Sequence, residues 1–149
     1  MRIRSARPSD ARLIIKFDHV ARAEPSRVAL IKKAISARSC FVATLGARVV
    51  AYGLLEHSFF GNGFISIVYV SSEFRRQGIG SALMRHIEHA CATSKLFTST
   101  NRSNVPMRRL LKKLGYVPSG VVNNLDVGDP EFFYYKPIRR KARRRSASR

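Results

Sequence analysis

The sequence of 149 residues predicts one α/β domain with a central mixed, mostly antiparallel β-sheet flanked by helices. Two observations predict this class. Apolar, β-branched runs over 40–45 and 48–56 follow one another directly and are joined at Gly46-Ala47, as in an antiparallel hairpin. In the second half of the chain, strand-like and helix-like segments alternate. That order is typical of strand–helix–strand units with helices on both faces of a sheet.

The first part of the chain is expected to form a short edge strand over 2–6 and then two helices. Residues 8–10, Pro-Ser-Asp, supply a turn and a helix cap, and apolar residues recur at helical spacing over 13–23. Glu24-Pro25-Ser26 ends this helix and begins a second one, whose apolar face extends over 28–35.

A strand over 64–70 and a helix over 78–92 enclose a loop that suits a phosphate group, and a glycine- and aromatic-containing loop over 58–63 precedes the strand. The first N–H groups of a helix have no helical partner, and the helix dipole adds about half a positive charge there. Gly78 and Gly80 would let a ligand approach the backbone closely. The alternative is an ordinary strand-to-helix turn with a basic flank.

The last elements are a short strand over 96–100, a helix from about 105 to 114, and two strands over 117–125 and 131–138. Asn104 is a natural N-cap for the helix, and Gly115 is a natural residue to end it.

Arg75-x-x-Gly78-x-Gly80, after a strand and at the start of a helix, resembles the cofactor motif of the GNAT N-acetyltransferase superfamily. The order of elements over 3–138 resembles the same superfamily, as does the helix that Asn104 opens and Leu114-Gly115-Tyr116 closes. The resemblance implies the GNAT acyl-CoA N-acyltransferase fold over 1–138 and acetyl-CoA as co-substrate, with no metal.

By this resemblance, backbone N–H groups over 76–81 hold the pyrophosphate of acetyl-CoA. The strand at 68–70 pairs with the pantetheine arm and points an N–H at the thioester carbonyl, while Asn104 touches the arm or acts only as an N-cap. The implied cofactor residues are Val68, Tyr69, Val70, Arg75, Arg76, Gln77, Gly78, Ile79, Gly80, Ser81 and Asn104.

The usual acid and base of the family are not found at their positions. Many members carry a tyrosine four residues before the closing glycine, and here that residue is Leu111. The positions that often hold a base correspond to Phe64, Ser66 and Ser99, none of which can serve near neutral pH. Substitutes are expected elsewhere: Glu56 as the base, and Tyr134 or Tyr135 as the proton donor. Each has a plainer alternative, an ion-paired carboxylate or packing aromatic rings.

Three acids within six residues stand out on so basic a chain, and we expect them to attract a cationic amine acceptor. They are Asp126, Asp129 and Glu131. The alternative is a polar turn, because Asp, Gly and Pro are the residues that turns use. The other acids are expected at helix starts or on exposed helix faces, solvated or ion-paired, or ordering the cofactor loop: Asp10, Asp18, Glu24, Glu88 and, in the loop, Glu73.

The formal net charge is +19, and residues 139–149 carry seven of the 28 basic side chains and no acid. This tail is expected to be disordered and could contact nucleic acid or the ribosome without sequence preference. No apolar run approaches the ~20 residues that span a bilayer, and Cys40 and Cys91 fit a reduced compartment as small core residues. A cytoplasmic protein is therefore expected, and the resemblance leaves a homodimer open.

The activity expected from these residues is transfer of an acetyl group from acetyl-CoA to a primary amine, by direct attack in a ternary complex. Two alternatives remain open. One is a toxin of the same family that acetylates aminoacyl-tRNA, and the other is a module that binds an acyl-CoA or a nucleic acid without turnover.

Overall fold

The computed structural model describes residues 1–139, and a seven-stranded sheet is its centre. The expected tail over 139–149 lies outside the described residues except for Arg139. The elements follow in the order β1 (Arg2–Ser5), α1 (Asp10–Phe17), α2 (His19–Ala23), α3 (Pro25–Ser36), β2 (Cys40–Leu45), β3 (Arg48–Phe59), β4 (Asn62–Val70), the 3₁₀ turn η1 (Ser72–Phe74), α4 (Ile79–Ala90), β5 (Lys95–Asn101), α5 (Val105–Lys113), β6 (Val117–Val122) and β7 (Glu131–Pro137).

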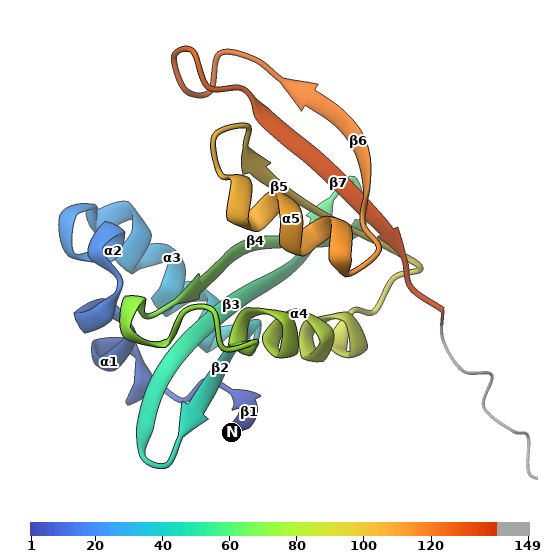
Figure 1. Cartoon of the computed structure of the whole chain (residues 1–149). Coiled ribbons are helices and arrows are strands. Elements are labelled where there is room, and N and C mark those ends of the chain that lie inside the picture. The colour runs from blue at the N-terminus through green and yellow to red at the C-terminus, as the bar shows by residue number, and fades with distance from the viewer. Residues whose placement is uncertain (140–149) are drawn as a thin grey trace, which may run out of the picture.

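The strand order is β1-β2-β3-β4-β5-β7-β6, and each neighbouring pair is antiparallel except β4 and β5. The helices lie on both faces of the sheet (Figure 1). One apolar core forms under α4 and α5, with Leu83, Ile87 and Leu111 fully buried in it. A second core forms under α1, α2 and α3 around Ile14, Ile31 and Tyr52. The predicted mixed, mostly antiparallel sheet with flanking helices is therefore confirmed.

The helix expected over 13–23 is two helices, because Asp18 ends the first and caps the second. The Asp18 carboxylate accepts hydrogen bonds from the backbone N–H groups of Val20 at 2.9 Å and Ala21 at 3.2 Å. An aspartate side chain that bonds the following N–H groups replaces helical hydrogen bonds, so it starts a new helix where it stands.

The loop expected over 58–63 is instead a tight hairpin turn between β3 and β4. Phe60 and Gly61 occupy its two central positions with φ of 50° and 75°, which allows both strands to continue up to the turn. The strand expected over 117–125 is also shorter, because β6 ends at Val122.

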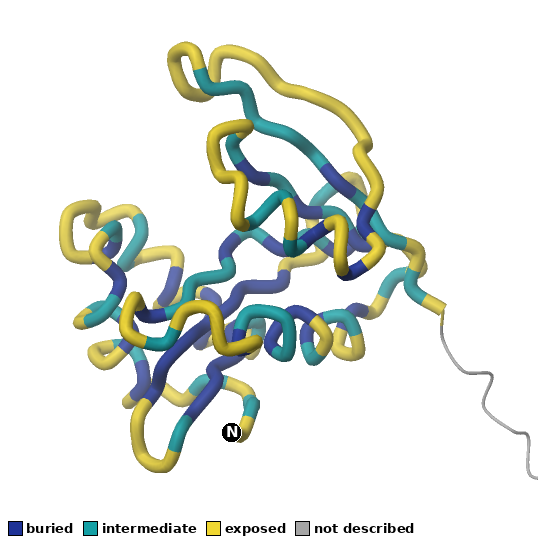
Figure 2. The backbone as a smooth tube through the Cα atoms, viewed as in Figure 1, coloured by how far each residue is buried: buried dark blue, intermediate teal, exposed yellow. Residues whose placement is uncertain are grey.

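Buried residues lie mainly along the central strands, whereas the turns and loops are exposed (Figure 2). Asp10 is 3% exposed and Asp18 is 0% exposed, so of the two expected states, solvated or ion-paired, both residues adopt the ion-paired one. Cys40 and Cys91 are free thiols in the core, as predicted, and burial raises the pKa of Cys40 to about 12. Within residues 1–139, no helix is both long enough and apolar enough to span a bilayer.

Candidate active site

The two parallel strands at the centre of the sheet pair only where they begin. β4 and β5 are in register from Gly63 with Leu96 to Ile65 with Thr98. Beyond these residues, β4 continues along β3 as far as Val70, while β5 continues along β7 as far as Asn101. The strands thus diverge beyond Ile65 and Thr98, and we call the unpaired stretch between them the β4–β5 opening (Figure 1).

Backbone groups of Val68 and Val70 face this opening. The N–H of Ser71 donates to the carbonyl of Val50 at 2.8 Å, which fixes the phase of hydrogen bonding between β4 and β3. In an antiparallel pair, alternate residues turn their N–H and C=O groups away from the partner. Those of Val68 and Val70 therefore point away from β3, and Arg75 Nε donates to the Val70 carbonyl at 3.0 Å from that side.

A bulge in β4 lies at the point of divergence. Ile67 pairs with Leu54 and Ile65 pairs with Leu55, so Ser66 is an extra residue on β4. A bulge bends a strand and strengthens its twist. This local bend helps β4 to part from β5 where the opening begins.

The loop before α4 ends with free N–H groups at the mouth of this opening. Arg76 and Gly78 have positive φ angles of 61° and 77°, which turn the chain sharply from η1 into α4. The first helical hydrogen bond runs from the N–H of Ala82 to the carbonyl of Gly78 at 3.0 Å. The N–H groups over 79–81 are therefore those of a first helical turn and point out of its end, beside the exposed Arg75 and Arg76.

Gly80 marks where α4, α5 and β4 meet. A Cβ atom placed on Gly80 would lie 3.6 Å from Leu110 Cδ2 and 3.6 Å from Val70 Cγ2. The end of α4 that carries the free N–H groups is thus next to the open side of β4. The predicted cofactor residues on β4 and on the loop are brought together, and their polar backbone and apolar side chains fit a phosphate joined to an extended arm.

Asn104 stands at the start of α5 as the predicted N-cap, and its side-chain oxygen accepts a hydrogen bond from Met107 N at 3.3 Å. The family's tyrosine position falls in the core: Leu111 is fully buried.

The two tyrosines considered as proton donors point to opposite faces of β7. Tyr134 is 7% exposed and packs into the core under α4 and α5. Tyr135 lies on the other face, with its ring centroid 5.6 Å from that of Phe97. Because adjacent residues of a strand face opposite sides, the two hydroxyls cannot serve the same side of the opening.

Glu56 lies at an open hollow of about 300 Å³ on the α3 side of the sheet. Lys33, His57 and the bulge residue Ser66 line the same hollow. Glu56 is exposed, and it is in register with Phe64 of β4. The predicted base candidate is therefore placed beside the point where β4 and β5 part.

The acidic cluster ties two loops together. Asn101 Nδ2 donates to Asp126 Oδ2 at 2.8 Å and to the Asp129 carbonyl at 3.2 Å. The N–H and Oγ of Ser103 donate to the Asp129 carboxylate at 3.0 and 2.5 Å, and the hydroxyl bond in particular lowers the pKa of Asp129. Glu131 begins β7 and pairs with Asn101. These contacts give Asp129 a structural role in joining the loop after β6 to the loop after β5.

Asp129→Ala is expected to loosen this connection. Without the carboxylate, the N–H of Ser103 loses its acceptor, so its hydrogen exchange should become faster while exchange in α3 stays unchanged. Hydrogen–deuterium exchange measured by mass spectrometry checks this, with Glu24→Ala as the matched acid-to-alanine control. Unchanged exchange over 102–104 would show that the connection does not order the loop.

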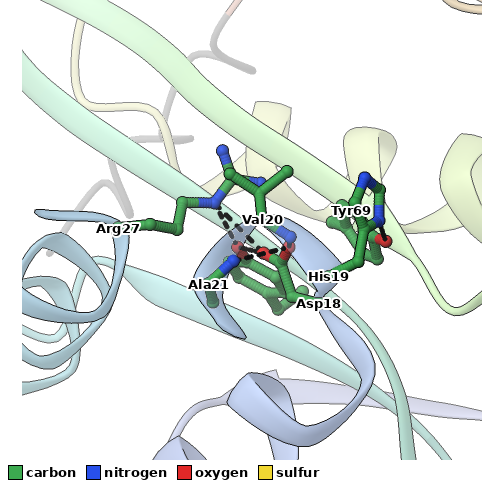
Figure 3. A network of polar contacts seen from close by, with 7 residues as sticks. Asp18, His19, Val20, Ala21, Arg27 and Tyr69 are labelled. Carbon is green, nitrogen blue, oxygen red and sulfur yellow. Dashed lines mark hydrogen bonds and ion pairs between the residues drawn. The ribbon is translucent and has the colours of Figure 1, made fainter. Parts of the chain in front are cut away.

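A polar network that was not predicted from the sequence lies on the α1–α2 side of the sheet (Figure 3). Besides its two capping bonds, Asp18 accepts from Arg27 Nε at 3.1 Å and from the Tyr52 hydroxyl. Burial alone would raise the pKa of Asp18, but the bonds from Tyr52 and Ala21 and the charge of Arg27 outweigh it and lower the pKa. Burial likewise raises the pKa of Tyr52, so its hydroxyl remains a donor.

Next to this network, His19 lies against Tyr69 of β4. The only sequence signal for Asp18 was an Asp just before a possible helix start. Nothing in the spacing of His19 and Tyr69, which are 50 positions apart, connects them.

The stability of the fold is expected to fall on acidification because of Asp18 and Asp10. Arg4 holds the Asp10 carboxylate at 2.7 Å, and this pairing, against the effect of burial, lowers the pKa of Asp10. A lowered pKa in the folded state stabilises the fold above the unfolded-state pKa of about 4, and this stabilisation is lost as the pH falls through the folded-state value. Urea unfolding should show a similar free energy of unfolding at pH 7 and pH 5, a lower one at pH 3, and a smaller decrease in Asp18→Asn. Equal stability at pH 5 and pH 3 would contradict this.

Comparison with known proteins agrees with the arrangement. The family model described as acetyltransferase (GNAT) family matches residues 10–116. A GNAT-family acetyltransferase from Bacillus cereus ATCC 10987 is 31% identical over 93% of this chain and 98% of its own, with a TM-score of 0.87. Ard1 from Thermoplasma volcanium is 20% identical over 93% and 98% of the two chains, with a TM-score of 0.80.

The structure of yncA from Salmonella typhimurium with its cofactor acetyl-CoA is 16% identical over 95% of both chains, with a TM-score of 0.75. The comparison with curated proteins found no match. The fold and the family resemblance predicted from the sequence are confirmed.

Proposed function

Because the chain belongs to the GNAT acetyltransferase family, we propose that it transfers the acetyl group of acetyl-CoA to a primary amine by direct attack in a ternary complex. The observation that carries the proposal is the β4–β5 opening with the start of α4 at its mouth. An opening with strand edges inside and a free helix end outside suits a long ligand with a phosphate at one end.

The residues present fit acetyl-CoA, which supplies an acetyl group activated as a thioester. The N–H groups over 76–81 would bind the pyrophosphate, with Arg75 and Arg76 adding charge. The backbone of Val68 and Val70 would pair with the pantetheine arm, with Val70 and Leu110 as an apolar wall. Asn104 would contact the arm from the start of α5.

Direct transfer requires few groups from the protein. An N–H of β4 aimed at the thioester carbonyl stabilises the negative charge that develops on its oxygen. The amine must lose a proton to attack, and the thiol must regain one as it leaves. The Leu111 side chain can neither accept the proton of the amine nor donate one to the thiol, so the proton-transferring groups come from other residues.

The acceptor is proposed to enter from the face opposite α4 and α5, because those helices cover the other face. Glu56, which lines the hollow that includes Ser66, is a candidate proton acceptor on that side. Tyr135 faces the same side and is the better placed of the two tyrosines to reach an acceptor, whereas Tyr134 faces the core under α5. The cluster of Asp126, Asp129 and Glu131 is proposed to draw a cationic amine toward the end of the sheet.

Release of free thiol from acetyl-CoA is the experiment that tests the activity. The acceptors would be polyamines, amino acids, aminoglycosides, peptides and charged tRNA, with cofactor affinity measured alongside. Thiol release with one acceptor class supports acetyl transfer and identifies the acceptor chemistry. Tight cofactor binding with no thiol release for any of these acceptors would favour a binding module instead.

A further inference from the structure

His19 and Tyr69 form a polar pair on the acceptor side of the sheet. His19 begins α2, and its Nδ1 lies 2.5 Å from the hydroxyl oxygen of Tyr69 on β4. The two rings are tilted, with centroids 5.7 Å apart (Figure 3). In the tautomer that carries the ring proton on Nε2, Nδ1 accepts this bond and the Tyr69 hydroxyl donates it.

This pair adjoins the β4–β5 opening. Tyr69 lies between Val68 and Val70, whose backbone groups face the opening. Arg75, which donates to the Val70 carbonyl, also places its guanidinium 5.5 Å from the centre of the Tyr69 ring. One side chain thus connects the phosphate loop, the open strand and Tyr69.

The pair lies on the side from which an acceptor must come. Val68 and Val70 pack toward α4, whereas Tyr69 packs with the residues under α1–α3. Two reactants at one carbonyl must approach it from different sides, and the helices α4 and α5 already cover one face. His19 is exposed on the other face, so it can exchange protons with water.

The surroundings hold both rings in place. Tyr69 stacks on Phe17 and Tyr52, with centroids 6.1 and 6.2 Å apart. His19 follows directly after Asp18, whose buried carboxylate is bound to two N–H groups of α2, to Arg27 and to Tyr52. The network therefore fixes the start of α2, and with it His19, against the sheet.

We propose that His19 accepts the proton of the attacking amine through the hydroxyl of Tyr69, which deepens the proposed function and rests on it. The ammonium form of the acceptor loses one proton to the Tyr69 oxygen as the Tyr69 hydroxyl proton passes to His19 Nδ1. The amine nitrogen then forms the C–N bond to the acetyl carbon and the C–S bond breaks. The second N–H proton neutralises the departing thiolate, and His19 releases its proton to water.

Histidine ordinarily takes up and releases protons near neutral pH, which suits this role. The charged groups next to the pair are Arg75 from the phosphate loop, Asp18 from the α1–α2 junction and Arg27 from α3. The Asp18 carboxylate is buried and already accepts bonds from Arg27, Tyr52 and two N–H groups, so it is not a competing base.

Two conservative variants test the role by kinetics. His19→Asn keeps an oxygen that accepts the Tyr69 bond but takes up no proton, and Tyr69→Phe keeps the stacked ring without its hydroxyl. Both should lower kcat/KM about 100-fold at pH 7, with unchanged Tm and cofactor affinity. The loss should shrink as the pH approaches about 10, where amines deprotonate unaided. His89→Asn, on the exposed end of α4, is the matched control.

Nitrogen-15 NMR of the His19 ring tests the pairing without any cofactor. We expect an unprotonated Nδ1 in the wild type, and a changed Nδ1 signal in Tyr69→Phe. A proton on Nδ1 in the wild type would overturn the proposal. It would also be overturned if His19→Asn kept the wild-type kcat/KM, or if Glu56→Gln lowered kcat/KM while His19→Asn and Tyr69→Phe did not.

The failures of the two proposals can be told apart. No thiol release by the wild-type chain with any acceptor contradicts the acetyltransferase activity, and with it the role of His19. Thiol release that is unaffected by His19→Asn contradicts only the role of His19. A deficit of the same size at every pH would indicate a structural role and would also contradict proton transfer.

Discussion

Gly80→Asp should weaken acetyl-CoA binding at least about 100-fold, or ~2.7 kcal/mol, and abolish turnover. A side chain at this position points between Leu110 and Val70, where the arm of the cofactor is proposed to run. A carboxylate there would also repel the pyrophosphate next to it. Isothermal titration calorimetry with acetyl-CoA measures the loss of affinity.

The free protein should tolerate this change, so the loss of affinity would not reflect misfolding. A Cβ on Gly80 makes ordinary contacts of 3.6 Å, and Gly80 does not have a positive φ angle. Gly80→Ala adds the smaller group and should give an intermediate loss of affinity. Ala90→Asp, at the exposed far end of α4, is the control and should bind normally. Wild-type affinity in Gly80→Asp would place the cofactor elsewhere.

Asp18→Ala should lower the free energy of unfolding by about 3 kcal/mol, because it leaves the half-buried Arg27 guanidinium and the buried Tyr52 hydroxyl without their acceptor. Asp18 is 0% exposed and bonds to both Arg27 and Tyr52. Removing it also removes the cap of α2, which adds to the loss. In a domain of this size, the expected fall in Tm is roughly 6–12 °C.

Glu24→Ala is the control for this substitution. Glu24 precedes α3 as Asp18 precedes α2, but its side chain makes no capping bond and is exposed. In thermal and urea unfolding, the free energy of unfolding of Asp18→Ala should be lower than that of Glu24→Ala by most of the predicted ~3 kcal/mol. Equal stability would mean that the Asp18 network contributes no net stabilisation.

The elements with strong local signals could be predicted from the sequence. Gly78 and Gly80 after a strand predicted the loop and the start of α4, because a helix period replaces a strand period there. Asn104 and Gly115 predicted the limits of α5, because asparagine is a common N-cap and glycine commonly ends a helix. The order of these elements then supported the family resemblance.

Long-range pairing could not be read from local patterns. Phe60 takes a positive φ that is uncommon for an aromatic residue, so the β3–β4 turn was expected to be a longer loop. The divergence of β4 from β5 depends on which strands pair, and hydrophobic spacing does not give strand order. Asp18 was expected at a helix start, solvated or ion-paired. Its burial and its partners Arg27 and Tyr52 could not be predicted, because they reach it only through the tertiary fold.

The measurement that tests acetyl transfer at the β4–β5 opening most directly is an NMR titration of backbone amides with acetyl-CoA. We expect saturable binding with the largest shift changes at Val68 and Val70 and at the N–H groups over 79–81. Changes confined to the hollow around Glu56, or to the β6–β7 loop, would contradict the proposed cofactor position. The absence of saturable binding would contradict the acetyltransferase proposal itself.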